Sequence, residues 1–194
     1  YIGDVPGADL RALVEAGRLS ASTTFDGVPA ADAVVICVPT PLRKSKEPDI
    51  SFIIAGVDGV VPRLRPGQVV VLESTTYPGT TEEILQPRLE AAGFTVGHDV
   101  FLAFSPERVD PGNQTWTTAN IPKVVGGVTP ACTDLAAALY ANVTNRVHRV
   151  SSPRVAETAK LLENTFRSVN IALANELALA CRAIDVDPWE VIEA

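Results

Sequence analysis

The stretch QVVVLESTTYPGTTEE, residues 68–83, has the pattern of a buried strand that leads directly into a helix. Its first six residues are mostly apolar and β-branched, as in a parallel strand that is covered on both faces. Thr80 and Glu83 then form the T-x-x-E pattern of a capping box, which predicts a helix that ends before Gly93. A strand followed at once by a helix is the repeating unit of an α/β fold.

The same alternation continues along the rest of the chain. Short apolar runs predict further strands at 33–38, 100–105, 123–128 and 146–150. Helical patterns with capping residues such as Asp49, Thr129 and Ser152 predict helices at 9–16, 50–64, 130–140 and 153–183. The order predicts an α/β fold: a Rossmann-like, doubly wound parallel sheet followed by a long central helix. Residues 106–121 fit neither period, which is typical of a functional loop or a disordered segment.

Composition excludes several classes of function. A net charge of −7 over 194 residues argues against binding to nucleic acid or to an anionic membrane surface. No apolar run approaches the roughly 20 residues needed to cross a bilayer. The three cysteines and two histidines are scattered, so we expect reduced core thiols, no disulfide, no metal site and a cytoplasmic protein. The chain contains no methionine, so we expect Tyr1 to lie inside a longer protein.

Three predicted strands end in polar sequence: PTP at 39–41, STTYPGTT at 74–81 and SPERVDPGN at 105–113. Each alone is explained by turn chemistry, because turns use Pro, Gly, Ser and Thr. Parallel strands, however, bring their carboxyl ends to one edge of the sheet, where ligands bind in doubly wound folds. Together these segments predict a site that includes Thr40, Thr75 and Glu107. Gly126 and Gly127 lack the spacing of a phosphate loop and are assigned to a tight turn.

The predicted helix at 153–183 carries Lys160 and Asn164 one turn apart, although apolar side chains cover most of its circumference. A helix of this composition is expected to be buried. The helix alone favours a structural interpretation, in which Lys160 reaches water or pairs with Glu157 or Glu163. The alternative is that a partly desolvated lysine takes part in chemistry. Apolar faces that its own sheet does not cover predict a homodimer built around this helix.

These segments resemble the UDP-glucose/GDP-mannose dehydrogenase family over essentially the whole chain. The motifs VPTPL, ESTTYPGTTEE, SPERVDPGN, KVVGG and AKLLENTFRSVNIALANELA are similar to the branch that acts on UDP-N-acetylhexosamines. The resemblance implies an NAD-dependent nucleotide-sugar 6-dehydrogenase that oxidises the C6 alcohol to a carboxylate in two steps, for surface polysaccharide synthesis. It also implies that residues 1–150 are an NAD-binding domain without its first strands, and that 151–194 are the central helix and the start of a middle, dimerisation domain.

The same resemblance assigns roles to particular residues. Lys160 and Asn164 match the pair that holds the sugar C6 oxygen, Glu107 matches the glutamate that activates water in the last step, and Thr75 would lie near the nicotinamide. NAD would be bordered by residues 38–42 and 74–76, specifically Val38, Pro39, Thr40, Pro41, Ser74, Thr75 and Thr76. The UDP-sugar substrate would be lined by Glu107, Arg108, Val109, Asp110, Lys160 and Asn164. Pro111 occupies the place of a second glutamate found in the UDP-glucose branch, for which Asp110 is a possible substitute.

Other parts of the family pattern are expected outside these residues. The dinucleotide glycine loop would precede Tyr1, and the cysteine nucleophile would follow Ala194, so we expect the chain to be inactive alone. Cys37 in a core strand, and Cys132 and Cys181 in helices, have no motif that could replace that nucleophile. The alternatives are a UDP-glucose or GDP-mannose dehydrogenase, a β-hydroxyacid dehydrogenase, which also carries Lys and Asn one turn apart, and a non-catalytic dimerisation or sensing module on a Rossmann-like fold.

Overall fold

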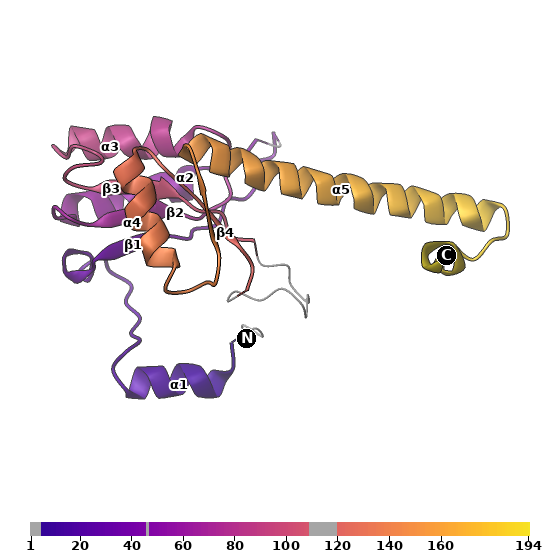
Figure 1. The fold of residues 1–194 in the computed structure, drawn as a ribbon, viewed down its shortest axis with the longest axis horizontal. Coiled ribbons are helices and arrows are strands. Elements are labelled where there is room, and N and C mark those ends of the chain that lie inside the picture. Colours follow the sequence, from indigo (N-terminus) through magenta and orange to yellow (C-terminus); the bar gives the residue numbers. More distant parts are fainter. Residues whose placement is uncertain (1–4, 46, 109–119) are drawn as a thin grey trace.

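A five-stranded sheet forms the centre of the protein, and one long helix extends away from it (Figure 1). The structure is a computed structural model that describes residues 5–45, 47–108 and 120–194. The strands lie side by side in chain order: β1 (Ala33–Ile36), β2 (Val69–Leu72), β3 (Phe101–Phe104), β4 (Lys123–Gly127) and β5 (Val147–Val150). Each lies within a run that the sequence predicted to be a strand.

Strand direction departs from the all-parallel expectation at one pair. β1, β2 and β3 are parallel to one another, and β4 is parallel to β5, but β4 runs antiparallel to β3. An antiparallel pair does not need the crossover helix that a parallel pair requires, and residues 106–121 have no helical period. Mixed sheets of this kind are common among doubly wound folds. As a result, β4 begins at the edge where β1, β2 and β3 end.

Two apolar cores cover the two faces of the sheet. On one face, α2 (Ser51–Val60), the π-helix η3 (Thr81–Leu85), α3 (Gln86–Ala91) and the start of α5 pack on Val70, Leu72, Leu102 and Phe104. On the other face, Ala136 and Tyr140 of α4 (Pro130–Tyr140) pack on the alternate strand residues Val69, Val71, Ala103 and Val125. This two-sided covering is the doubly wound arrangement that the alternation of strands and helices predicted.

The other helices include α1 (Gly7–Glu15), which has no buried residue, and α6 (Pro188–Glu193) near the end of the chain. Short 3₁₀ turns lie at η1 (Val28–Ala30) and η2 (Val61–Arg63). Predicted capping is confirmed at Thr129 and Ser152, whose side chains accept from Cys132 N and Val155 N. Among the helices that the structure describes, none combines the length and apolar character needed to cross a membrane.

The capping box predicted at Thr80 and Glu83 is wrong. Thr80 has helical dihedrals and makes no side-chain cap; its buried hydroxyl donates to the carbonyl of Tyr77. The acceptor at this helix start comes instead from Glu157, far along the chain in α5. Its carboxylate accepts from Gly79 N at 2.5 Å, Thr81 N at 3.0 Å and the Thr81 hydroxyl at 2.7 Å. A tertiary contact therefore supplies what the local pattern was expected to supply.

The long helix α5 (Pro153–Ala183) is buried only in part, so the expectation of a buried helix is wrong for most of its length. Its buried residues are Pro153, Ala156, Glu157 and Cys181. Beyond its first turns it projects from the sheet (Figure 1), and large apolar side chains such as Phe166 and Leu173 are exposed. An apolar pattern around a helix thus indicated a surface that this chain does not itself cover.

Gly126 and Gly127 at the end of β4 have a packing role, as predicted. A Cβ on Gly126 would lie 2.1 Å from the carbonyl oxygen of Ser152, and one on Gly127 would lie 2.3 Å from the Thr133 nitrogen. Only glycine therefore allows β4 to approach the starts of α4 and α5 so closely. This close packing fixes the first turn of α5 against the sheet.

Candidate active site

The carboxyl ends of β1, β2 and β3 lie at one edge of the sheet. Ile36 is in register with Leu72, which is in register with Phe104. The segments PTP, STTY and SPER, which follow these residues, therefore leave the sheet at the same edge. This confirms the predicted arrangement of the three polar segments.

Ser74 joins the first two segments. Its buried hydroxyl accepts from Val38 N at 2.8 Å and lies 2.9 Å from the Val38 carbonyl oxygen, to which it can donate. Thr76 is also buried and shares a hydrogen bond with the Thr80 hydroxyl, whereas Thr75 between them is exposed. The hydrogen bonds of the two buried side chains hold the backbone here, and Thr75 between them stays accessible at the edge.

Lys160 reaches this edge from α5. Its ammonium group donates to the carbonyl oxygen of Glu107, directly after β3. The side chain is half-buried, and this desolvation lowers the pKa of Lys160, while Glu163 and Glu107 act in the opposite direction. Pairing with Glu157 is not seen, because that carboxylate accepts from Gly79 and Thr81.

Asn164 lies one turn after Lys160 on the same side of α5 and is also half-buried. Glu157 lies almost one turn before Lys160 and holds this part of the helix to the connection after β2. The local geometry of α5 therefore brings the ammonium of Lys160 to the edge where β3 ends, with the amide of Asn164 one turn further along the same side of the helix. Such a pair has donors suited to an oxygen atom that gains negative charge.

Arg108 uses its whole guanidinium group in contacts within the protein. Nε and Nη2 form an ion pair with Glu163 of α5, and Nη1 donates to the Pro122 carbonyl at 2.8 Å. The Glu107–Arg108 segment is thereby tied both to α5 and to the chain just before β4. Val109 and Asp110, together with Pro111, lie outside the described residues.

A cluster of ionisable side chains at the same edge was not predicted from the sequence. Lys123, at the start of β4, lies 2.9 Å from Glu73 Oε1 and 3.4 Å from Glu107 Oε2. The Tyr140 hydroxyl donates to Glu73, and Cys37 donates to its other oxygen at 3.4 Å. The signals in the sequence were a glutamate at the end of a buried strand and a lysine at the start of another.

Burial and the Glu73 carboxylate change the titration of both neighbouring donors. The pKa of Cys37 is raised to about 11, chiefly by burial and then by the charge of Glu73. The pKa of Tyr140 is raised above its ordinary value by burial, then by its hydrogen bond to Glu73 and by the charge of that carboxylate. Cys37 is nevertheless exposed and lies just beyond β1, so its assignment to a core strand was wrong; Cys132 and Cys181 are buried in α4 and α5.

Within the described ranges, no group of three or more candidate ligands could hold a metal ion.

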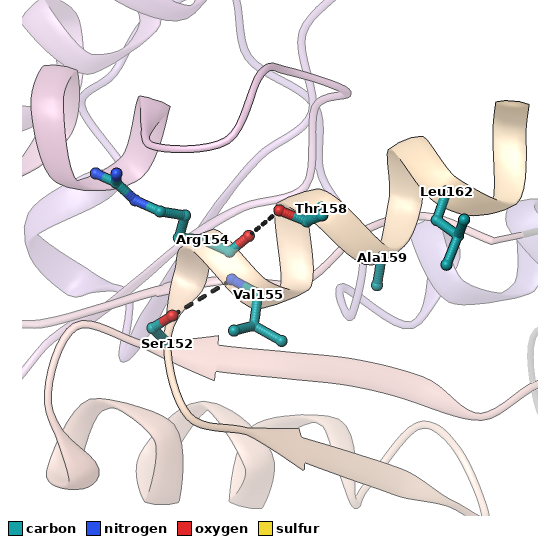
Figure 2. A pocket seen from close by; sticks show the side chains of 6 residues that line it. All are labelled: Ser152, Arg154, Val155, Thr158, Ala159 and Leu162. Carbon is teal, nitrogen blue, oxygen red and sulfur yellow. Dashed lines mark hydrogen bonds between the residues drawn. The ribbon is translucent and has the colours of Figure 1, made fainter.

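Two hollows lie near these elements. One of about 180 Å³ is lined in part by Glu73, Glu107, Lys123 and Tyr140, which places it at the ionisable cluster. A second, more open one of about 390 Å³ lies along the first turns of α5, where Val155, Ala159 and Leu162 point to one side of the helix (Figure 2). The two hydroxyl groups that line this second hollow form hydrogen bonds at the start of α5: Thr158 donates to the Arg154 carbonyl, and Ser152 accepts from Val155 N. The second hollow therefore continues the apolar surface of α5.

A mostly parallel, doubly wound sheet with polar segments at its carboxyl edge, followed by a long helix, is a Rossmann-type fold. Residues 6–144 match the NAD binding domain of the UDP-glucose/GDP-mannose dehydrogenase family, and residues 154–194 match the central domain of that family. The chain therefore belongs to the UDP-glucose/GDP-mannose dehydrogenase family.

Individual relatives agree with this assignment. The chain is 45% identical over 166 residues to Protein CapL of Staphylococcus aureus. This match covers 84% of this chain and 39% of CapL. It is 37% identical over 188 residues to a UDP-N-acetyl-D-glucosamine 6-dehydrogenase of Pseudomonas aeruginosa, covering 96% of this chain and 44% of that enzyme. The structure of a UDP-D-ManNAc dehydrogenase from Pyrococcus horikoshii superposes with a TM-score of 0.89 at 34% identity, over 96% of this chain and 44% of that one. The chain spans less than half the length of these proteins.

The residues at the edge of the sheet fit one part of the NAD that this domain type binds. Thr75 is exposed, Pro39 and Pro41 are exposed, and Thr40 is half-buried between them. Ser74 holds the two segments together, so that hydroxyl and backbone groups are available beside an open surface. Such a rim offers hydrogen-bonding groups to a polar part of the cofactor.

Proposed function

We propose that the protein containing this chain is an NAD-dependent nucleotide-sugar 6-dehydrogenase, most similar in function to UDP-N-acetylglucosamine 6-dehydrogenase. The proposed substrate is a UDP-N-acetylhexosamine, whose C6 alcohol is oxidised in two steps to a carboxylate. The observation that supports this best is the half-buried Lys160, which contacts Glu107 at the edge of the sheet with Asn164 one turn away.

Lys160 and Asn164 are proposed to hold the oxygen on sugar C6. An ammonium and an amide that converge on one oxygen stabilise the negative charge that develops on it, as in an oxyanion hole. Burial lowers the pKa of Lys160 and so makes its neutral form more accessible. A neutral lysine amine can accept the proton of the C6 hydroxyl, which gives Lys160 a second role as general base.

The cofactor role belongs to the segments that Ser74 holds together. Val38, Pro39, Thr40 and Pro41 border NAD on one side in this proposal, and Ser74, Thr75 and Thr76 border it on the other. When bound, NAD supplies the hydride acceptor for both oxidations. Thr75 is the residue of this group whose hydroxyl is exposed and could contact NAD directly. Ser74 and Thr76 are buried and would act by holding the backbone of the two segments in place.

Glu107 is proposed to activate water in the last step, when an acyl group bound to a cysteine elsewhere in the protein is hydrolysed. The contacts of Arg108 add a structural role to the substrate contact that the resemblance implied. Its ion pair with Glu163 and its hydrogen bond to Pro122 support a role in holding the segment around Glu107. Val109 and Asp110 are kept as substrate-lining candidates from the resemblance alone.

We further propose that two copies associate through α5. Exposed apolar side chains extend along the helix at Leu162, Phe166, Val169, Ile171, Leu173, Leu177 and Leu179. A surface of this kind normally marks an interface, and two-fold dimers are the commonest oligomers. The exposed free thiol of Cys37 suits a reducing compartment, which supports a cytoplasmic location.

The deciding experiment is turnover by the full-length protein against a panel of UDP-sugars and GDP-mannose, with NADH counted per sugar consumed. The proposed two-step oxidation gives two NADH per sugar and a uronic acid product. One NADH per sugar contradicts it in favour of a simple alcohol dehydrogenase. A preference for UDP-glucose or GDP-mannose moves the protein to another branch of the family.

A further inference from the structure

Lys123 lies between two carboxylates at the edge of the sheet. Its ammonium is 2.9 Å from Glu73 Oε1 and 3.4 Å from Glu107 Oε2. The side chains of Lys123 and Glu73 are only 12% and 13% exposed, whereas that of Glu107 is 50% exposed. The inner pair is therefore shielded from water, and the outer carboxylate remains accessible.

The inner pair is held rigidly by its neighbours. Glu73 accepts from the Tyr140 hydroxyl and from Cys37, so both of its oxygens are engaged. Lys123 also lies over the Tyr140 ring, with Nζ 5.0 Å from the ring centre. A lysine fixed in this way presents its charge at a defined position, unlike a surface lysine whose side chain samples many rotamers.

Glu107 is held at its main chain and at its carboxylate by different elements. Its carbonyl oxygen accepts from Lys160 of α5, and Oε1 of its carboxylate accepts from Arg108 N at 2.7 Å. Oε2 faces Lys123 of β4.

We propose that Lys123 is a positioning residue for Glu107. It holds the Glu107 carboxylate at the edge of the sheet, and Glu73 with Tyr140 holds Lys123 in turn. This inference rests on the proposed function, in which Glu107 activates the water of the last step. In that step water adds to the acyl carbon and one of its protons passes to Glu107. As the C–S bond breaks, Glu107 passes this proton to the departing sulfur, so acid and thiol are released and Glu107 is again a carboxylate.

If Lys123 positions Glu107, its removal should affect the oxidation steps and the hydrolysis step differently. Removing Lys123 leaves Lys160, Asn164 and the NAD rim in place, so formation of NADH in the first turnover is preserved. Hydrolysis of the acyl group depends on the placement of Glu107, and misplacement of a catalytic group by about 1 Å can cost on the order of 100-fold in rate. A burst of NADH followed by slow release of the acid is the expected signature.

The test compares two variants of the full-length protein, Glu73→Gln and the double variant Glu73→Gln with Lys123→Met. The first retains Lys123 and an amide oxygen that can accept from it, so it is the reference background for the second, which removes Lys123 without leaving an unpaired buried carboxylate. We expect the double variant to lose roughly 10- to 100-fold in steady-state turnover relative to Glu73→Gln, with burst amplitude and KM for UDP-N-acetylglucosamine within about 3-fold. Lys123→Arg keeps the charge and should retain most of the activity.

A second comparison tests whether Lys123 acts through Glu107. In a Glu107→Gln background, the same replacement of Lys123 should cause little further loss, because residues that act together are not additive. If the Met variant does not fold by circular dichroism, Lys123→Gln with Glu73→Gln retains a polar pair and takes its place. Equal turnover with and without Lys123, or a burst that falls as much as the steady state, overturns the inference. Absence of NADH formation by the wild-type protein with every nucleotide sugar overturns the proposed function as well.

Discussion

Glu157 and Thr81 lie 76 positions apart in the chain, yet one oxygen of the Glu157 carboxylate accepts from both the backbone N–H and the hydroxyl of Thr81. Its second oxygen accepts from Gly79 N. Since Lys160 follows Glu157 by about one helical turn, this contact couples the position of Lys160 to the connection after β2, which contains Thr75. The two proposed parts of the active site, on β2 and on α5, are held together by a buried carboxylate.

Replacing Glu157 by Ala is expected to destabilise the full-length protein by about 2–4 kcal/mol, because buried N–H groups lose their acceptor. Chemical denaturation measures the change through the shift in midpoint. Glu90→Ala, at an exposed carboxylate of α3, is the matched control and should change stability by less than about 0.5 kcal/mol. Equal stabilities of the two variants would show that the buried contact contributes little.

Lys160→Ala is expected to reduce turnover on the order of 100- to 1,000-fold, as for loss of one donor to a developing oxyanion. Stability should not fall strongly, because a half-buried ammonium carries a desolvation cost that disappears with it. Steady-state kinetics and thermal unfolding of the same preparation measure both effects. Turnover within a few-fold of wild type would assign Lys160 a structural role.

The lowered pKa of Lys160 also predicts how stability depends on pH. Between the lowered value in the folded state and the ordinary value of 10.5, the unfolded chain binds more protons at this group. Stability contributed by this group therefore rises with pH through that window and is lowest below it. Thermal unfolding of wild type and Lys160→Ala from pH 7 to 10 should show wild type gaining on the variant as pH increases. A constant difference would contradict the shift.

Cys37 is expected to react slowly although it is exposed. Its pKa of about 11 leaves little thiolate at pH 8.5, so alkylation should be about 10-fold slower than that of a free cysteine after its greater intrinsic nucleophilicity is included. Glu73→Gln removes the nearby charge and should accelerate the reaction. Peptide mapping after timed iodoacetamide treatment separates Cys37 from the other cysteines. Rapid labelling of Cys37 in the wild type at pH 8.5 would refute the prediction.

The sequence predicted correctly those elements that depend only on residues within one short segment. The strand at 69–72 and the helix caps at Thr129 and Ser152 were predicted because apolar runs and capping side chains act locally. The direction of β4 could not be predicted, since a short apolar run has the same pattern in either direction. The contacts of Lys123 with Glu73 and Glu107 depend on that direction. For the same reason, the carboxylate that replaces a local cap at Thr81 could be found only in the folded chain.

The exposed apolar surface of α5 predicts self-association that a single charge should disrupt. Leu173→Glu places a carboxylate on this surface, and burying it in an interface without a partner is strongly unfavourable. Analytical ultracentrifugation of the full-length protein at micromolar concentration should show a dimer for wild type and a shift to monomer for Leu173→Glu. Leu42→Glu changes an equally apolar, exposed residue that lies outside α5 and should leave the dimer intact. A wild-type protein that sediments as a monomer, or a dimer that Leu173→Glu does not weaken, would contradict an interface centred on this helix.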